Sequence, residues 1–192
     1  VLLVEKDDLT NGATGRNHGL LHSGARYAVT DQNSATECIK ENMILRKIAR
    51  HCVEETDGLF ITLPEDDLAY QATFVAACQK AGIRADIIDP SEARHLESSV
   101  NPTLIGAVRI PDASVDPFRL TVANVLDARR YGADILTYHE VTDLLVEQTK
   151  VVGVALRNHL TGETYDVHTS LVINAAGIWG HLVAKRAGIT VN

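Results

Sequence analysis

The sequence is poor in cysteine. Only three are present among 192 residues, and Cys38, Cys52 and Cys78 lie far apart between apolar neighbours. No CxxC pair occurs, which argues against an iron–sulfur cluster or a structural zinc site within this sequence. We therefore predict that the three side chains are core thiols of a protein in a reducing compartment.

Long apolar runs and an excess of positive charge are absent as well. No stretch approaches the roughly 20 apolar residues that cross a bilayer, and no signal peptide is visible. The net charge of -7 argues against broad binding to nucleic acid. Apolar residues make up 45% of the chain, which is enough for a packed core in one large domain or two small ones.

The most informative segment is Gly12–Tyr27, GATGRNHGLLHSGARY, with four glycines, two histidines and two arginines. It follows the apolar run Val1–Val4, which ends in Glu5. A buried strand that ends in a carboxylate and leads into a glycine-rich loop is typical of a dinucleotide site. The carboxylate accepts hydrogen bonds from a ribose, and glycine lets the backbone approach a flat ligand. The alternative is an exposed strand-end acid before a surface loop.

A second glycine motif is missing. A Rossmann unit places a strand and a GxGxxG turn about 20 residues before its ribose-binding acid. Here only four residues precede Glu5, and there is no initiator Met. We therefore expect this chain to be a fragment of a longer protein whose first βα unit has been removed.

Charged and aromatic side chains of the same loop are candidates for chemistry. Arg16 and Arg26 are suited to a phosphate or a carboxylate. His18 and His22 are four residues apart, a spacing that binds metal on a helix, but glycines interrupt the segment and no third ligand is evident. We predict no metal site, and expect a hydrogen-bonding or acid–base histidine.

Periodicity and turn signals predict alternating helices and strands. Asp89-Pro90 and Asp116-Pro117 place a capping acid before a proline, and the second helix should bury Phe118, Val122, Val125 and Leu126. The predicted helices are 34–52, the segment around 74–81, the one that begins at 90, and 117–131. The predicted strands are 1–4, 58–63, 133–138, 141–146, 151–156, 164–167 and a buried strand at 171–175, with a hairpin turn at 160–163.

Strands at both ends and a mixed segment between them indicate an insertion. We predict an α/β protein with an incomplete, Rossmann-like FAD-binding domain at 1–54 and 133–188. Residues 55–132 should form a segment of an inserted α+β substrate domain and a connecting helix. The boundaries follow from the change from helical to strand patterns near 133.

The predicted strand at 171–175 ends in the small residues Ala175, Ala176 and Gly177. They are interpreted either as a strand-to-helix turn that needs close packing, or as a second place where backbone approaches a cofactor phosphate. Trp179, the only tryptophan, is taken alone as a packing residue.

Three motifs occur together in one order: VEKDDLTNGATGRNHGLLHSGARY at 4–27, VDPFRLT at 115–121 and VINAAGIWG at 172–180, with RNHLTGET at 157–164. In this combination the chain resembles the FAD-dependent glycerol-3-phosphate dehydrogenases, a family of the D-amino-acid-oxidase-like flavoproteins. The resemblance extends over nearly the whole chain. It departs from the family in lacking the GxGxxG segment and the C-terminal half.

The resemblance implies roles for single residues. Glu5 would bind the adenosine ribose of FAD, and Val141 would contact the adenine side through its backbone. Arg26 and Tyr27 would face the substrate phosphate, and His22 would lie close to the flavin as a candidate catalytic group that handles a proton. The flavin and its phosphates would be lined by Thr14, Gly15, Asn17, His18 and Gly19, and by Ala175, Ala176 and Gly177.

The resemblance also implies a reaction and its partners. The parent protein would oxidise sn-glycerol 3-phosphate to dihydroxyacetone phosphate in anaerobic respiration. Electrons would pass through further flavin and iron–sulfur subunits to a membrane quinone. The chain would then be cytoplasmic and peripheral on the cytoplasmic face of the bacterial inner membrane, and the isolated fragment would be inactive.

Two alternatives stay open from the sequence. One is a sibling flavoprotein that oxidises a 2-hydroxy acid or an amino acid, because Thr-Gly-x-Asn-x-Gly loops recur in such enzymes. The other is a non-enzymatic nucleotide-binding scaffold.

Overall fold

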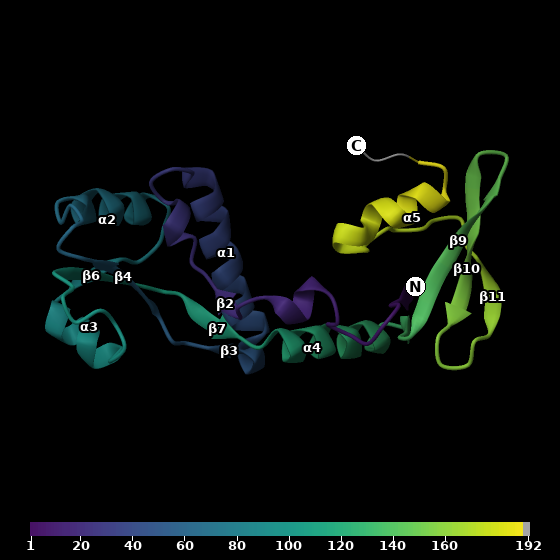
Figure 1. Ribbon diagram of the computed structural model, residues 1–192, viewed down its shortest axis with the longest axis horizontal. Helices are drawn as coiled ribbons and strands as arrows, with labels where there is room; N and C mark the ends of the chain where they lie inside the picture. Colours follow the sequence, from purple (N-terminus) through teal and green to yellow (C-terminus); the bar gives the residue numbers. More distant parts are fainter. Residues whose placement is uncertain (190–192) are drawn as a thin grey trace. The chain divides into compact units, whose positions relative to one another are not determined.

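The computed structural model describes residues 1–189, and the chain divides into two compact units (Figure 1). Unit 1 combines Val1–Asn17 with the chain from Pro117 onward, whereas unit 2 is the continuous segment His18–Asp116. The glycine-rich loop thus passes from one unit to the other between Asn17 and His18. In the described part of the chain, no helix is both long and apolar enough to cross a membrane.

Unit 1 contains a parallel strand pair and an antiparallel meander. β1 (Leu2–Val4) pairs with β8 (Asp134–Leu136), with Leu2 opposite Asp134. The meander has the order β11-β10-β9, formed by β9 (His139–Glu147), β10 (Lys150–Asn158) and β11 (Thr164–His168). The helical elements of the unit are η1 (Ala13–Arg16), α4 (Pro117–Arg130), η4 (Gly177–Trp179) and α5 (Gly180–Arg186).

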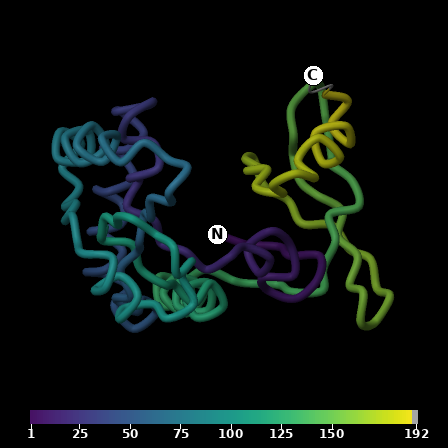
Figure 2. Tube along the Cα trace, turned by 60° about the vertical axis from the view of Figure 1, so that its left-hand side comes forward, coloured from purple at the N-terminus to yellow at the C-terminus, as the bar shows by residue number. Residues whose placement is uncertain are grey.

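The meander also positions α5 within unit 1. Val154 and Leu156 are the buried centre of β10, and Gly162 makes the following turn with a positive φ of 78°. Arg186 of α5 forms an ion pair with Glu140 of β9 at 3.3 Å. α5 therefore packs beside the meander, as the yellow and green traces show in Figure 2.

Unit 2 has two small antiparallel sheets covered by helices. One sheet has the order β4-β6-β5 and the other β2-β7-β3. Their strands are β2 (Leu20–Leu21), β3 (Val53–Glu54), β4 (Gly58–Thr62), β5 (Asp86–Ile88), β6 (Gly106–Ile110) and β7 (Ala113–Val115). The helical elements are η2 (Ala25–Tyr27), α1 (Gln32–Ile48), η3 (Arg50–Cys52), α2 (Tyr70–Lys80) and α3 (Pro90–Leu96).

The main core of unit 2 joins segments that are distant in sequence. Ala25 and Ala28 from η2 and its end pack with Ala35 and Ile39 of α1. The same cluster contains Phe74 and Cys78 of α2 together with Val108 and Ile110 of β6. This packing places residues 18–54 in unit 2, so its boundary differs from the predicted one at 54/55. α4 packs on η1 and β8 and therefore belongs to unit 1. The second segment of unit 1 thus begins at Pro117, whereas the second segment of the predicted FAD-binding domain begins at 133.

Most predicted elements are confirmed, with their caps. Asp89 accepts a hydrogen bond from the Ser91 amide at the start of α3, and Gly82 follows α2 with a φ of 82°. Pro117 is the first residue of α4. The hairpin at 160–163 joins β10 and β11 in antiparallel register.

Two packing predictions are wrong. Residues 171–175 form no strand, and Leu171 and Ile173 are 72% and 81% exposed. A strand needs a neighbour for its backbone hydrogen bonds, and none of the described strands pairs with this segment. The apolar side of α4 is also not buried: Phe118, Val122 and Leu126 are exposed, and Val125 is only half-buried.

All three cysteines are free thiols, but only Cys52 and Cys78 belong to the core. Cys38 is half-buried, which corrects the prediction of three core thiols. Burial raises the pKa of the Cys78 thiol to about 11, from an ordinary value near 9.

Alkylation tests the environment of Cys78. Because the thiolate is the reactive form, iodoacetamide at pH 8 should modify native Cys78 at least about 100-fold more slowly than an unperturbed thiol. Mass spectrometry of the labelled peptides measures this rate, and the protein in denaturant is the control in which all three thiols react. Native labelling of Cys78 at the rate of a free thiol would contradict the burial.

Candidate functional site

Glu5 lies directly after β1, at the carboxyl end of the parallel pair. Its amide donates to the Leu136 carbonyl at 2.8 Å, and its carbonyl accepts from the His139 amide at 2.9 Å. One carboxylate oxygen, Oε1, accepts from the Asp7 amide at 2.9 Å. The backbone therefore fixes Glu5 between β8 and the start of β9, the strand that carries Val141.

A tyrosine and an aspartate that the sequence patterns did not indicate lie beside Glu5. Tyr138 adopts a positive φ of 58°, which is rare for a non-glycine residue, and its amide donates to the Asp7 carbonyl. The negative charge of Asp8 raises the pKa of the Tyr138 phenol, with smaller contributions from burial and from a hydrogen bond to Asp8. The acidic run at 7–8 is the only sequence signal for this contact.

The first half of the glycine-rich loop forms the compact turn η1. Asn17 closes it, because its side-chain amide donates to the Thr14 carbonyl at 2.6 Å. The Arg16 guanidinium donates to the Asn11 carbonyl. A Cβ at Gly15 would lie 2.2 Å from the Thr10 carbonyl oxygen, so only glycine fits there without a shift of the backbone. Thr14 remains exposed on this turn.

The motif at 174–180 lies against the same turn. A Cβ at Gly12 would be 3.3 Å from Cζ3 of Trp179, which places the tryptophan ring over the start of the loop. Asn174 holds the motif, because it donates to the Gly180 carbonyl at 2.7 Å and accepts from the Ala176 amide at 3.3 Å. The structure thus brings together two of the segments predicted to contact the cofactor.

These segments fit a flat, phosphate-bearing cofactor. Ala175 and Gly177 are exposed, and a Cβ at Gly177 would meet no atom within 4 Å. Within residues 1–189, no hydrogen bond uses the amides of Ala175 and Gly177. Exposed amides beside small side chains give a ligand close access to backbone donors.

The second half of the loop belongs to unit 2. His18 accepts a hydrogen bond from the Leu20 amide at its Nδ1, 3.0 Å away. Gly19 has a φ of 69°, and its carbonyl accepts from the Val115 amide at 2.7 Å. His18 and Gly19 therefore lie in a different unit from Thr14, Gly15 and Asn17.

His22, Arg26 and Tyr27 all belong to unit 2. The rings of His22 and Tyr27 meet edge to face, with centroids 6.0 Å apart. Arg26 lines a cavity of about 380 Å³, and in the described structure its guanidinium has no hydrogen-bond or ion-pair partner. The other polar side chains of the cavity wall are Thr30, Thr62, Asp66, Asp67, Tyr70 and Gln71. His22 and Tyr27 do not line this cavity, so the structure pairs them with each other and places Arg26 separately.

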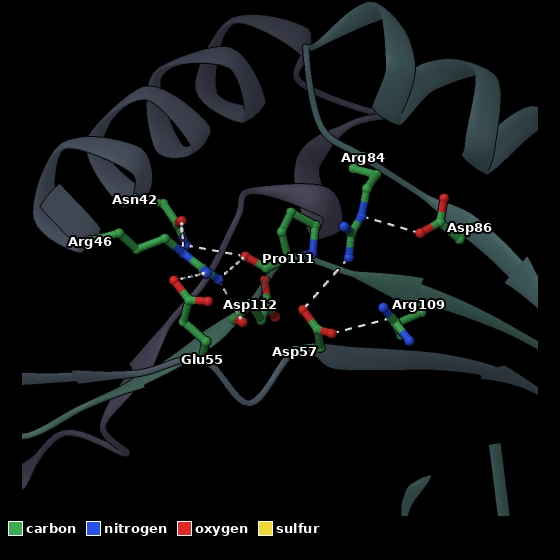
Figure 3. Close-up of polar contacts among 9 residues, drawn as sticks. All are labelled: Asn42, Arg46, Glu55, Asp57, Arg84, Asp86, Arg109, Pro111 and Asp112. Carbon is green, nitrogen blue, oxygen red and sulfur yellow. Dashed lines mark hydrogen bonds and ion pairs between the residues drawn. The ribbon is translucent and has the colours of Figure 1, made fainter. Parts of the chain in front are cut away.

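A buried polar cluster behind the loop has no signal in the sequence. Asn42 and Arg46 of α1 reach the carbonyl oxygen of Pro111, and Arg46 also reaches that of Asp112 (Figure 3). A second cluster in the same view joins Asp57 to Arg84 and Arg109. Arg46 and Asp112 are 66 positions apart, so no local pattern indicates the contact.

The chain is similar over its full length to dehydrogenase subunits. The A subunit of anaerobic glycerol-3-phosphate dehydrogenase from Escherichia coli (strain K12) is 65% identical over 191 residues, which cover 100% of this chain and 35% of that protein. The A1 subunit of the enzyme with the same name from Haloferax volcanii is 47% identical over 201 residues, and covers 100% and 34%. The chain therefore spans about a third of the length of these relatives.

Solved structures share the fold. L-proline dehydrogenase from P. horikoshii has a TM-score of 0.77 at 25% identity, with 100% of this chain and 50% of that chain covered. Glycerol-3-phosphate dehydrogenase from Bacillus halodurans, in complex with FAD, has a TM-score of 0.70 at 21% identity, with 97% and 31% covered.

The predicted α/β flavoprotein fold is confirmed by these neighbours. A family model described as "FAD dependent oxidoreductase" matches residues 1–191. The chain belongs to the FAD dependent oxidoreductase family.

Proposed function

We propose that the intact protein carrying this sequence oxidises sn-glycerol 3-phosphate to dihydroxyacetone phosphate with FAD. The observation that carries the proposal is 65% identity over the whole chain to a protein named as part of a glycerol-3-phosphate dehydrogenase. Family membership supports the cofactor and the reaction class. Unit 1 serves as the FAD-binding part, and unit 2 serves as the substrate-facing part.

The cofactor contacts come mainly from unit 1. Glu5 binds the adenosine ribose with the carboxylate oxygen that its own turn leaves open, since Oε1 is taken by the Asp7 amide. Thr14, Gly15 and Asn17 line the flavin side. Ala175, Ala176 and Gly177 receive the phosphates, supported by their small side chains and the exposure of Ala175 and Gly177, and Val141 contacts the adenine side. When bound, FAD supplies the oxidant that accepts a hydride from C2 of the substrate.

Arg26 anchors the substrate phosphate. A planar guanidinium matches two phosphate oxygens at once, and Arg26 is available because no described acid or carbonyl engages it. Tyr27, the next residue of η2, is a further proposed substrate contact, on the side of His22 and outside the cavity that Arg26 lines. Asp66 and Asp67 line the cavity beside Arg26, but each is engaged in its own turn, with the amides of Leu63 and Ala69 respectively.

His22 accepts the proton of the C2 hydroxyl. In the described structure neither of its ring nitrogens has a hydrogen-bond partner, so a lone pair is free for a substrate proton. An imidazole is suited to this role near neutral pH. The edge contact holds the His22 ring beside the Tyr27 ring, with centroids 6.0 Å apart.

Electrons leave the flavin through partner subunits. The relatives are named as one lettered component of a dehydrogenase, which supports a multi-subunit enzyme. The three cysteines form no CxxC pair, which argues against an iron–sulfur cluster within this sequence. We infer flavin and iron–sulfur partners that deliver the electrons to a quinone, with the complex peripheral on the cytoplasmic face of the membrane.

A second candidate is oxidation of an amino acid or a 2-hydroxy acid. It is favoured by the structural match to L-proline dehydrogenase, at a TM-score of 0.77. Such substrates carry a carboxylate, which Arg26 would bind as readily as a phosphate.

A substrate panel separates the candidates. The intact protein is assayed with an artificial electron acceptor against sn-glycerol 3-phosphate, 2-hydroxyglutarate, L-proline and glycine. We expect turnover with glycerol 3-phosphate alone, and a yellow flavin spectrum in the purified protein. Turnover with 2-hydroxyglutarate or an amino acid but not with glycerol 3-phosphate would favour the second candidate. A colourless protein without turnover would favour a non-enzymatic scaffold.

A further inference from the structure

The backbone on both sides of His22 is held by buried polar side chains. Before it, the Leu21 carbonyl accepts a hydrogen bond from the side-chain amide of Asn42 at 2.9 Å. After it, the Ser23 amide donates to Oδ1 of Asp112 at 2.6 Å. Asn42 is 0% exposed and Asp112 is 8% exposed. Both residues that flank His22 are therefore fixed by side chains from α1 and from the turn before β7.

Arg46 completes this cluster. Its Nε donates to the Asn42 oxygen at 2.8 Å, which orients the Asn42 amide nitrogen toward Leu21. Its Nη2 donates to the carbonyls of Pro111 and Asp112 at 3.0 and 2.9 Å, which fixes the turn that carries the Asp112 carboxylate (Figure 3). The side chain is 13% exposed, so water competes little for these bonds.

Arg26 is held by other contacts. Gly24 has a φ of 87°, and a Cβ there would lie 2.7 Å from Cβ of Cys38 and 2.8 Å from the Ala35 carbonyl oxygen. The following Ala25 and Ala28 are buried against α1. Apolar packing thus places Arg26, whereas hydrogen bonds place His22.

We propose that Asp112, supported by Asn42 and Arg46, is a positioning residue that sets the location of the His22 imidazole for proton transfer. This inference rests on the proposed function. The cluster does not touch the substrate; it acts through the backbone of Leu21 and Ser23. The Ser23 hydroxyl is buried without a partner in the described structure, so the amide is the group of Ser23 that the cluster holds.

A double-mutant cycle in the intact protein tests the inference. Turnover of glycerol 3-phosphate is measured per bound FAD, which removes losses from misfolded protein. His22→Gln should lower kcat by at least about 100-fold, the usual effect of losing a general base. Asp112→Ala should lower kcat by about 10-fold, with KM changed by less than about threefold, because Arg26 stays in place. In the His22→Gln background, Asp112→Ala should cost less than about twofold, because both act through one group.

Three further variants keep the test decisive. Asp112→Asn retains an oxygen that accepts from the Ser23 amide, so its kcat should return to within about threefold of the wild type. If Asp112→Ala binds no FAD, Arg46→Lys takes its place in the cycle, since it keeps the charge beside Glu55 and loses the fork to Pro111 and Asp112. Asp57→Asn is the matched control: it breaks ion pairs to Arg84 and Arg109 in the neighbouring cluster, and kcat should not change.

The outcomes separate this inference from the proposed function. Absence of wild-type turnover with glycerol 3-phosphate would remove the proposed function, and this inference with it. Normal wild-type turnover with an equal cost of Asp112→Ala in both backgrounds would overturn the inference alone. An unchanged kcat in His22→Gln would overturn this inference together with the proposed role of His22, while glycerol 3-phosphate would remain the substrate.

Discussion

Replacing Arg26 with alanine raises the KM for glycerol 3-phosphate by about 10- to 100-fold, the equivalent of about 1.5–3 kcal/mol of charge-assisted hydrogen bonding. The effect follows from a guanidinium that lines the cavity in unit 2 without an ion-pair partner among residues 1–189. Bound FAD should be retained, because unit 1 carries most of the proposed cofactor contacts. Steady-state kinetics and the flavin absorbance of the purified variant measure both quantities.

Two substitutions calibrate the Arg26 result. Arg26→Lys keeps the charge but loses the planar fork, so its KM should lie between those of the wild type and the alanine variant. Arg84→Ala removes another exposed arginine of unit 2, one that pairs with Asp57 and Asp86, and it should leave KM unchanged. An Arg26→Ala enzyme with wild-type KM would show that the phosphate is anchored elsewhere.

Replacing Gly15 with alanine should weaken FAD binding by about 5- to 150-fold. The added Cβ would lie 2.2 Å from the Thr10 carbonyl oxygen, so the backbone of η1 has to move. A strain of about 1–3 kcal/mol, typical of overpacking, then opposes the conformation in which Thr14 and Asn17 line the cofactor. The dissociation constant of FAD, measured by reconstitution of apoprotein, reports this loss.

The same loop offers a control for the Gly15 substitution. A Cβ at Gly12 would approach only the Trp179 ring, at 3.3 Å, and Trp179 is 47% exposed, so its side chain is able to shift. Gly12→Ala should therefore change FAD affinity by less than about threefold. Equal losses in the two variants would mean that the loop tolerates no side chain for a reason other than the Thr10 contact.

Local patterns predict the elements of this protein well. The hairpin of β10 and β11, the cap at Asp89 and the glycine after α2 each depend on residues within a few positions of one another. The strand expected at 171–175 depends on a partner that local sequence does not specify, and no described strand pairs with it. β-Propensity alone therefore misassigned a segment whose apolar residues are exposed.

The candidate site likewise has some features that the local sequence predicts and others that depend on contacts between distant residues. Glu5 and the glycine-rich loop are visible in the sequence because strand, acid and glycines are contiguous. The contact between Ser23 and Asp112 spans 89 positions, and no periodicity relates the two. For Gly15, the sequence predicts a glycine that gives a ligand access to the backbone. In the structure, the nearby Thr10 carbonyl oxygen already requires a glycine at this position.

Anaerobic reduction of the flavin by glycerol 3-phosphate is the decisive measurement for the proposed oxidation. One equivalent of sn-glycerol 3-phosphate per FAD is added to the intact protein without an electron acceptor. We expect loss of the oxidised flavin absorbance, with one dihydroxyacetone phosphate formed for each FAD reduced. An unchanged spectrum with glycerol 3-phosphate, in a protein whose flavin is bleached by an amino acid or a 2-hydroxy acid, would contradict the proposed function.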